Sequence, residues 1–351
     1  MDKKRQELID LLQKAVELEF STIPPYLMAA FSIHPEANRE CFAIIHSVYM
    51  EEMLHLLLAA NVMTAINGSV KLSSSNVPAY PLKLEFRGEN FRDREFDINL
   101  ERLSPDAIDT FMKIELPADW EEPIDKMMVE VTIPGYTIGE FYELIKKLLT
   151  DYCKEIGEEN VFTGDPAWQV GEDFYWQADG KPIVVTNLEQ ALEAIDIIVE
   201  QGEGASAESV LDGDRAFFGQ PEEVAHFFRF NEIKEGRRYK PDDDPHAPPT
   251  GKKLAVDYDK VFPIKKNCSE ADFANTPKLR QLNLEFNKHF TLMLKGMEKA
   301  FNGYPKELYP AIMNDMHGMV KIANEMVQVP IAGDPEDRTG APTFEYINLP
   351  F

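Results

Sequence analysis

The sequence predicts a mainly α-helical protein, a bundle of long helices with a long irregular crossover and a C-terminal helical hairpin. Two observations predict this fold class. Apolar residues recur at helical spacing along two N-terminal stretches, each about 40 Å long at 1.5 Å per residue. Hydrophobic residues make up 44% of the 351-residue chain and charged residues 28%. That composition is typical of a globular protein with a full core and not of a disordered chain.

The first two predicted helices cover Arg5–Phe31 and Asn38–Ile66, with the break at residues 34–36. Pro24-Pro25 should kink the first helix or begin a new turn, because proline has no amide hydrogen. Asn67-Gly68 indicates a left-handed cap at the end of the second helix. Two helices of this length joined by a short loop are typical of an antiparallel pair in a bundle.

The rest of the chain divides into a crossover, further bundle helices and a C-terminal part. Residues 67–135 contain several prolines and short mixed segments, which predict a long irregular crossover with little helix. We expect a bundle domain over residues 1–235 and, over 236–351, a linker and helical hairpin packed on the bundle. The later predicted helices cover Thr137–Ile156, residues 187–201 with Asn187 as N-cap, Pro221–Lys234, Pro277–Phe301 and Leu308–Gln328.

The charge of the chain excludes several classes of partner. Its 61 acidic residues outnumber 36 basic ones, for a formal net charge of −25. A surface this acidic repels phosphate backbones and anionic lipid, so we expect neither a nucleic acid nor a membrane partner. Cys41, Cys153 and Cys268 are far apart, and the N-terminus has no signal-peptide pattern. Both features predict a cytoplasmic protein with reduced thiols.

Acidic residues on apolar helix faces are the main functional signal. Glu19 lies on the inward stripe of the first helix, and burying an unpartnered carboxylate is costly. Glu52 and His55 form a Glu-x-x-His pair on the inward face of the second helix, whereas neighbouring Glu51 is rotated away. A bundle helix can provide two ligands to iron or manganese through a carboxylate and an imidazole one turn apart.

The third helix adds Glu140, which shares the stripe of Leu144 and Leu148. Glu, then Glu-x-x-His, then Glu is the order of the first three helices in a di-metal carboxylate bundle, whose fourth helix supplies a further Glu and His. Two candidates remain for that last pair. Spacing nominates Glu223 with His226, whereas the glycine-flanked helix end offers Glu203 in its place.

Several sequence blocks, taken together, resemble the ferritin-like domain of the iminophenyl-pyruvate dimer synthase family. The similarity spans roughly residues 1–235, and Ala341–Tyr346 is similar to the segment after that domain in many relatives. The blocks are Glu17–Leu27, Glu51–Leu56 with Ala59–Asn61, Ile138–Tyr142, Gln201–Gly204 and Ala225–Phe230.

This resemblance implies a ferritin-like four-helix bundle with inward Glu and His residues. It also implies kinship to a violacein-pathway enzyme that oxidatively couples two imine molecules derived from an aromatic amino acid. On the family pattern, Glu203 is preferred to Glu223 as the partner of His226. The predicted metal ligands are then Glu19, Glu52, His55, Glu140, Glu203 and His226.

Three functions are compatible with such a site, and whether the protein is an enzyme stays open. The first is an oxidoreductase with two iron or manganese ions, which uses dioxygen to oxidise a small organic substrate derived from an aromatic amino acid. The second is iron binding or storage, and the third a metal-free scaffold with a buried polar network. Haem is an alternative cofactor, because one inward histidine would suffice as an axial ligand. Each of the three functions is compatible with a homo-oligomer.

Overall fold

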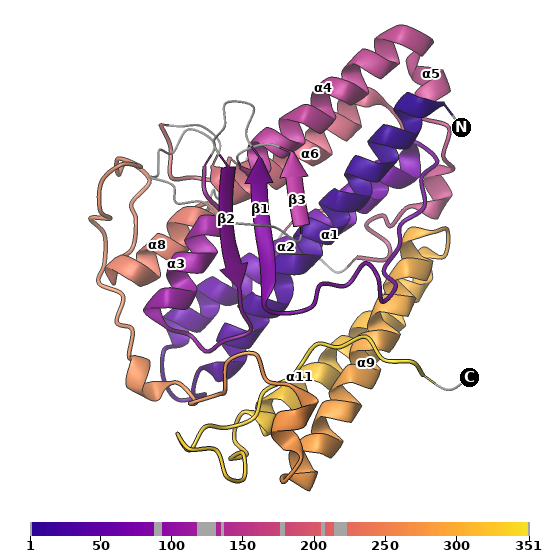
Figure 1. The fold of residues 1–351 in the computed structure, drawn as a ribbon. Coiled ribbons are helices and arrows are strands. Elements are labelled where there is room, and N and C mark those ends of the chain that lie inside the picture. Colours follow the sequence, from indigo (N-terminus) through magenta and orange to yellow (C-terminus); the bar gives the residue numbers. More distant parts are fainter. Residues whose placement is uncertain are drawn as a thin grey trace.

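The computed structural model describes residues 2–87, 93–117, 131–134, 137–175, 180–204, 208–213 and 223–349. Long helices dominate it, which confirms the predicted fold class (Figure 1). The helices are α1 (Lys3–Ser32), α2 (Arg39–Ala65), α3 (Pro105–Ile114), α4 (Ile138–Ile156), α5 (Glu158–Val161), α6 (Leu188–Glu203), α8 (His226–Glu235), α9 (Pro277–Phe301), α10 (Leu308–Pro310) and α11 (His317–Met326), with a π-helical turn at Ala311–Met316 and 3-10 turns at Pro166–Trp168, Tyr258–Lys260, Glu270–Phe273 and Pro305–Glu307.

The antiparallel pair α1 and α2 forms the centre of the bundle. Pro24 and Pro25 both lie inside α1, which remains one helix from Lys3 to Ser32. Pro25 cannot donate to the carbonyl of Ser21 four residues earlier. The hydroxyl of Tyr80 donates to that carbonyl at 2.8 Å, so the crossover supplies the bond that the proline removes.

Helix α2 is buried around nearly its whole circumference after Leu54. Asn67 has a φ of 62°, which confirms the predicted left-handed cap at the end of α2. Among the described helices, α2 alone is long and apolar enough to cross a membrane, and 61% of its most apolar window is buried inside the protein.

The crossover holds more regular structure than predicted, although residues 88–92, 118–130 and 135 of it lie outside the described residues. Helix α3 begins at Pro105, and the Ser104 side chain accepts from the amide of Ala107. The strands β1 (Leu82–Arg87), β2 (Asp93–Ile98) and β3 (Val131–Pro134) form a sheet in the order β2-β1-β3. β1 pairs antiparallel with β2 and parallel with β3.

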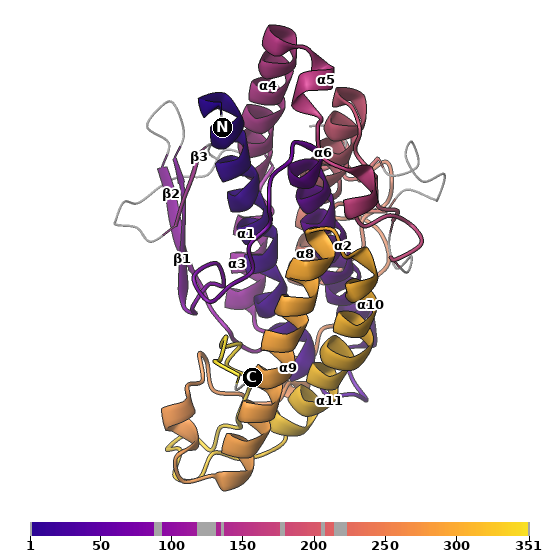
Figure 2. The same cartoon turned by 90° about the vertical axis from the view of Figure 1, so that its right-hand side faces the viewer.

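The sheet lies to one side of the helices, seen face-on in Figure 1 and edge-on in Figure 2. β2 contacts α3, and β3 contacts α4. The bundle is completed by α4 and α6, whose N-caps Thr137 and Asn187 accept backbone amides three residues later. The N-cap role predicted for Asn187 is thereby confirmed.

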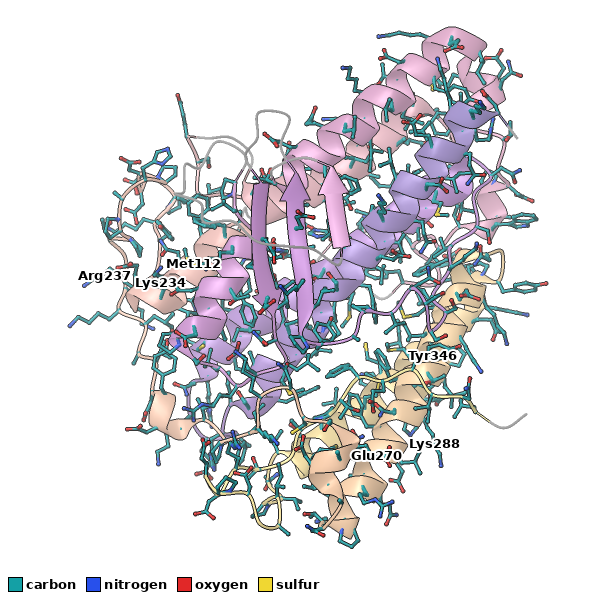
Figure 3. The ribbon with its side chains drawn as sticks, in the orientation of Figure 1. Met112, Lys234, Arg237, Glu270, Lys288 and Tyr346 are labelled. Atoms are coloured by element: carbon teal, nitrogen blue, oxygen red, sulfur yellow. The ribbon has the colours of Figure 1, made fainter. Side chains whose placement is uncertain are left out.

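The C-terminal hairpin of α9 and α11 confirms the predicted helical pair and packs against α1 and α2 (Figure 2). The tail then runs back along α9, with Tyr346 beside this helix (Figure 3). Asn283, Asn287 and Thr291, spaced one turn apart on α9, hydrogen-bond the tail at residues 343, 345 and 347. These side chains satisfy backbone groups of the tail, whose described residues from 341 to 349 form no helix or strand.

Candidate metal centre

Three carboxylates and two imidazoles meet in the interior of the bundle. Glu19 comes from α1, Glu52 and His55 from α2, Glu115 from the residue after α3, and His226 from the start of α8. None of the five is more than 4% exposed. Because a buried ionised carboxylate needs a positive partner, a group this acidic requires protons or cations to hold it together.

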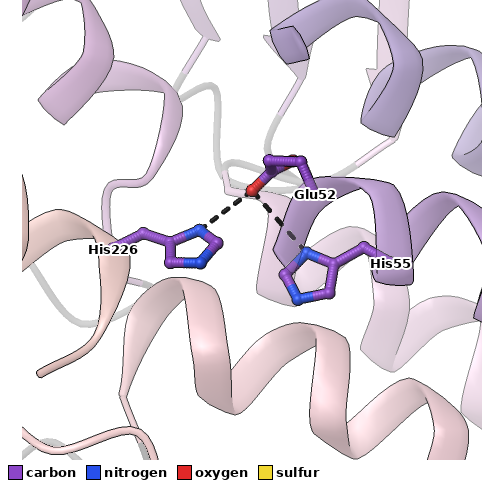
Figure 4. A group of neighbouring side chains, drawn as sticks. All are labelled: Glu52, His55 and His226. Atoms are coloured by element: carbon purple, nitrogen blue, oxygen red, sulfur yellow. Dashed lines mark ion pairs between the residues drawn. The ribbon is translucent and has the colours of Figure 1, made fainter. Parts of the chain in front are cut away.

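Glu52 lies between the two imidazoles (Figure 4). Its Oε1 is 2.9 Å from Nδ1 of His226 and 3.6 Å from Nδ1 of His55. The two rings are stacked with centroids 5.4 Å apart. One atom from each of these three residues can be chosen so that all lie within 4.8 Å of one another, which is the spacing of ligands around one metal ion.

The remaining two carboxylates flank this arrangement, one beside each imidazole. Glu19 Oε2 is 3.5 Å from Nδ1 of His55, and Glu115 Oε2 is 3.5 Å from Nδ1 of His226. The group therefore consists of two similar halves, each with one histidine and one glutamate, that share Glu52. Glutamate and histidine side chains that project inward from the helices are the kind of ligands that bind metal ions in helical bundles.

The other nitrogen of each imidazole is held by a separate buried residue. Nε2 of His55 is 2.7 Å from Oε1 of Gln201 on α6, and Nε2 of His226 is 2.7 Å from Oε2 of Glu51 on α2. An acceptor at Nε2 keeps the proton on that nitrogen and leaves Nδ1 free to bind a metal. Both rings are thus oriented with Nδ1 toward the carboxylates.

Arg229 on α8 compensates the charge of Glu51. Its guanidinium donates twice to Glu51 Oε1 at 3.1 Å, once to Ser47 Oγ at 2.9 Å, and to Asp212 Oδ2 at 3.4 Å. Arg229, Glu51 and Asp212 are all buried. This ion pair fixes α8 against α2, so the backbone that carries His226 is held in place.

Hydroxyl groups hold the outer oxygens of the carboxylates. Thr22 donates to Glu52 Oε2 at 2.8 Å, and Tyr142 on α4 donates to Glu19 Oε1 at 2.6 Å. Tyr26 donates to Glu115 Oε1 in the same way. Since each hydroxyl occupies one oxygen, the other oxygen of each glutamate turns toward the imidazoles.

The pKa values reflect a group that attracts positive charge. Burial raises the pKa of Glu19 to about 7 and also raises that of Glu115. Burial opposes the charged form of Glu52 too, but the two imidazoles hold its pKa below the usual value. Burial by itself would lower the pKa of both histidines, yet the carboxylates raise it, to about 10 for His55 and well above the usual value for His226. Without a metal, these imidazoles carry the compensating charge as protons.

One buried atom of the group lacks a hydrogen-bond partner among the described residues. Nδ1 of His226 makes no hydrogen bond to any described residue, although Glu52 Oε1 lies 2.9 Å away. The oxygen is close enough but lies outside the direction in which the nitrogen can donate. A cavity of about 10 Å³ lined by Glu19, Glu52, His55 and Glu115 adjoins this atom's partners. The donor set and this space fit a small metal ion.

Glu203, at the end of α6, lines the same cavity. Its Oε1 accepts from the backbone amide of Gly139 at 2.7 Å, in the first turn of α4. A Cβ at residue 139 would lie 2.6 Å from the Glu203 carboxylate, so the glycine allows this approach. The structure therefore brings Glu203 to the edge of the group, where it also caps a neighbouring helix.

Glu140, by contrast, does not join the group. It is exposed on the first turn of α4, whereas the buried face of this helix is centred on Phe141, Ile145 and Leu149. Glu140 lies about 140° around the helix from Ile145 at 100° per residue. The prediction therefore put the buried face of α4 at the wrong angle around the helix. In place of a carboxylate, α4 contributes the hydroxyl of Tyr142 to this group.

Glu223 also lies outside the group. The expected helix over Pro221–Lys234 begins only at His226, and residues 221–222 lie outside the described residues. Val224 pairs with Leu211 in an isolated bridge, so residues 223–226 are not one helical turn. Glu223 is exposed, and its carboxylate is 3.4 Å from Arg229.

Glu115 and Glu51 are the carboxylates that the sequence interpretation missed. Ser104-Pro105 is a typical start of a helix, and from there Ile108, Phe111 and Glu115 come at spacings of three and four. That pattern could have placed Glu115 on the buried face. Glu51 had no such signal, because its contacts with His226 and Arg229 depend on how α8 packs against α2.

Comparison with known proteins places the chain in a family. A profile of the ferritin-like family matches residues 12–235, more than half of the chain, so the protein belongs to the ferritin-like family. The chain is 23% identical to a dichlorochromopyrrolate synthase of Lentzea aerocolonigenes, over 99% of this chain and 36% of that protein. It therefore spans about a third of the relative's length.

The fold has a solved counterpart. A ferritin-like protein from Caulobacter vibrioides has 20% sequence identity and a TM-score of 0.55, covering 92% of this chain and 96% of that one. The predicted ferritin-like fold is confirmed, and the synthase relative agrees with the family resemblance seen in the sequence. The Glu52, His55 and His226 group could hold a metal ion within this fold.

Proposed function

We propose that the buried group binds two iron or manganese ions and that the protein is an oxidoreductase acting with dioxygen on a small organic substrate. The observation that carries the proposal is the orientation of the two imidazoles. Both turn Nδ1 toward the shared carboxylate Glu52, while Gln201 and Glu51 hold Nε2. Ligands fixed in this way are prepared for a metal before it arrives.

Charge balance supports two ions. Glu19, Glu52, Glu115 and Glu203 together carry four negative charges when ionised, which two divalent cations neutralise. Glu51 is not counted among these carboxylates, because Arg229 and His226 contact it. In the proposed ligand set Glu115 replaces Glu140, and Glu203 provides the fourth carboxylate.

Bound iron or manganese would supply one-electron redox chemistry and a site at which dioxygen reacts. The residues of the chain would orient the ligands and keep water out of the site. Thr22, Tyr26 and Tyr142 hold the carboxylate orientations, and the buried location of the group excludes bulk water. The oxidase proposal is supported by the synthase relative, whose name describes formation of a small organic product. A substrate derived from an aromatic amino acid is part of the proposal.

Metal content tests the first half of the proposal. Protein purified without chelator should contain about two iron or manganese ions per chain by elemental analysis. Glu52→Gln keeps the side-chain shape but removes the shared charge, and we expect it to lose most of the metal. Glu140→Gln is the matched control, because the same change at an exposed position should leave the metal content unaltered. Wild-type protein that takes up neither metal would overturn the proposal and favour a metal-free polar network.

Oxygen uptake tests the second half. Aromatic amino acids and their keto and imino derivatives are added to metal-loaded protein, and dioxygen consumption is measured over time. We expect uptake with at least one of these compounds in wild type and Glu140→Gln, and none in Glu52→Gln. Metal loading without substrate-dependent uptake, together with continued accumulation of iron beyond two ions, would instead establish storage.

A further inference from the structure

A second cavity, partly open to solvent, lies on a different side of α1 and α2 from the metal centre. It is a cavity of about 60 Å³ where the C-terminal hairpin packs on the bundle. Ile23 and Leu57 line it from the bundle side, and Met293 and Ile312 from the hairpin. The described side chains around it are aliphatic, thioether or aromatic, and Tyr175 is the one among them that carries an oxygen.

The size and lining of this cavity decide what it can hold. One water molecule needs about 10–15 Å³, whereas a benzene ring occupies a cavity of about 150 Å³. A space of about 60 Å³ therefore suits a molecule of a few heavy atoms. Water is a poor occupant, because it requires two to four polar partners that this lining does not offer.

The wall of the cavity can adapt to an occupant. Five methionines line it: Met53, Met293, Met297, Met316 and Met319. Methionine is unbranched and polarisable, so it adjusts its shape around a small apolar guest. Met316 also belongs to the π-helical turn Ala311–Met316, and such turns occur frequently at functional sites.

Two residues that line the cavity are sequence neighbours of residues in the metal centre. Glu19 and Phe20 are neighbours on α1, as are Glu52 and Met53 on α2, and the second residue of each pair lines the cavity. The two sites therefore lie at the same level along α1 and α2, on different sides of these helices.

We propose that this cavity binds dioxygen, an apolar molecule of matching size, and holds it beside the metal centre. This inference rests on the proposed function for its biological meaning. Its physical content, selective binding of a small apolar molecule between the bundle and the hairpin, does not depend on metal or on activity.

Xenon and dioxygen itself are the probes. Crystals of the protein pressurised with xenon should show xenon in this cavity. In the metal-depleted full-length chain with labelled methionine methyl groups, dissolved dioxygen should increase the relaxation rates of Met293, Met316 and Met319 several-fold more than those of Met28 and Met63. The last two are fully buried but lie outside the cavity lining.

A cavity-filling variant sharpens the test. Ile312→Phe, at a half-buried lining position, should abolish the xenon peak and the excess relaxation while metal content stays unchanged. Ile322→Phe on α11 is the matched control, half-buried but outside the lining, and should keep both signals. Absence of xenon from the wild-type cavity, or lining methyl groups that respond no more than Met28 and Met63, would overturn the proposal. Because neither readout involves metal, such a failure is distinct from a failure of the metal proposal.

Discussion

The two faces of the α1–α2 pair contain opposite kinds of buried site. On one face Glu19 and Glu52 meet two imidazoles and an ion-pair network, and on the other Phe20 and Met53 line an apolar cavity. Both sites are enclosed by the same two helices. They differ in how the neighbouring elements complete them, since α3, α6 and α8 bring polar partners and the C-terminal hairpin brings methionines.

The contrast between the two faces shows where the structure is sensitive to change. Hydrogen bonds and ion pairs are directional, so removing one member of the polar group leaves another buried and unpaired. Dispersion contacts are individually small and lack direction, so the apolar face can repack around a changed side chain. We therefore expect conservative substitutions to be costly on the polar face and mild on the apolar one.

Arg229→Met should have the largest effect on stability. It removes the guanidinium that pairs with the buried carboxylates of Glu51 and Asp212, which should lower the free energy of unfolding by about 3–5 kcal/mol. Urea unfolding of the metal-free protein measures this change. Lys234→Met is the control, because Lys234 and its partner Asp109 are both nearly half exposed, and its cost should stay below about 1 kcal/mol. Equal losses of unfolding free energy in the two variants would contradict the greater sensitivity of the buried ion pair.

Gln201→Leu should weaken metal binding while leaving every proposed ligand in place. Without Gln201, His55 loses the acceptor that holds its Nε2, and loss of such a partner lowers metal affinity about 10–100-fold. Titration with iron(II) or manganese(II), monitored by thermal unfolding, measures the shift. Gln281→Leu on α9 should bind metal like wild type, since Gln281 is exposed and contacts Glu285 far from the site. Unchanged affinity in Gln201→Leu would show that His55 is not positioned this way.

Tyr142→Phe removes one hydrogen bond to Glu19 without altering the ring packing. We expect it to reduce the free energy of unfolding by about 1–3 kcal/mol, because it leaves a buried oxygen of Glu19 without its donor. Tyr304→Phe, at a position 61% exposed, should have no measurable effect. Chemical denaturation of both variants provides the comparison. If Tyr142→Phe leaves the free energy of unfolding unchanged, Glu19 accepts a hydrogen bond from another donor in the variant.

Met293→Leu, on the apolar face, should be the mildest of these changes. The two side chains have similar volume, and such a swap usually costs less than about 1.5 kcal/mol. The same denaturation experiment measures it. A loss as large as that of Arg229→Met would contradict the idea that this face tolerates repacking.

Much of the fold could be predicted because local signals dominate it. The periodicity of α1, α2 and α9 arises directly from their apolar residues, and the Asn187 cap and the Asn67 turn are local chemistry. The sheet and α3 were not predicted. Strands of six or fewer residues carry little periodicity, and their pairing depends on contacts between distant segments.

The candidate site divides in the same way. Glu19, Glu52 and His55 were predicted because they interrupt apolar faces of long helices, and the structure brings them together with His226. Glu140 was wrongly placed because it was aligned with Leu144 and Leu148, which are half-buried residues at the edge of the apolar face of α4 and not at its centre. Glu51 and Gln201 could not be found from periodicity, because their roles depend on which helix packs against them.

Anomalous scattering at the iron and manganese edges, from crystals of protein purified without chelator, is the sharpest test of a metal centre inside the bundle. We expect strong peaks within bonding distance of Nδ1 of His55 and Nδ1 of His226, with Glu52 between them. Crystals in which the interior side chains keep these positions, yet show no anomalous peak at either edge, would contradict the metal centre.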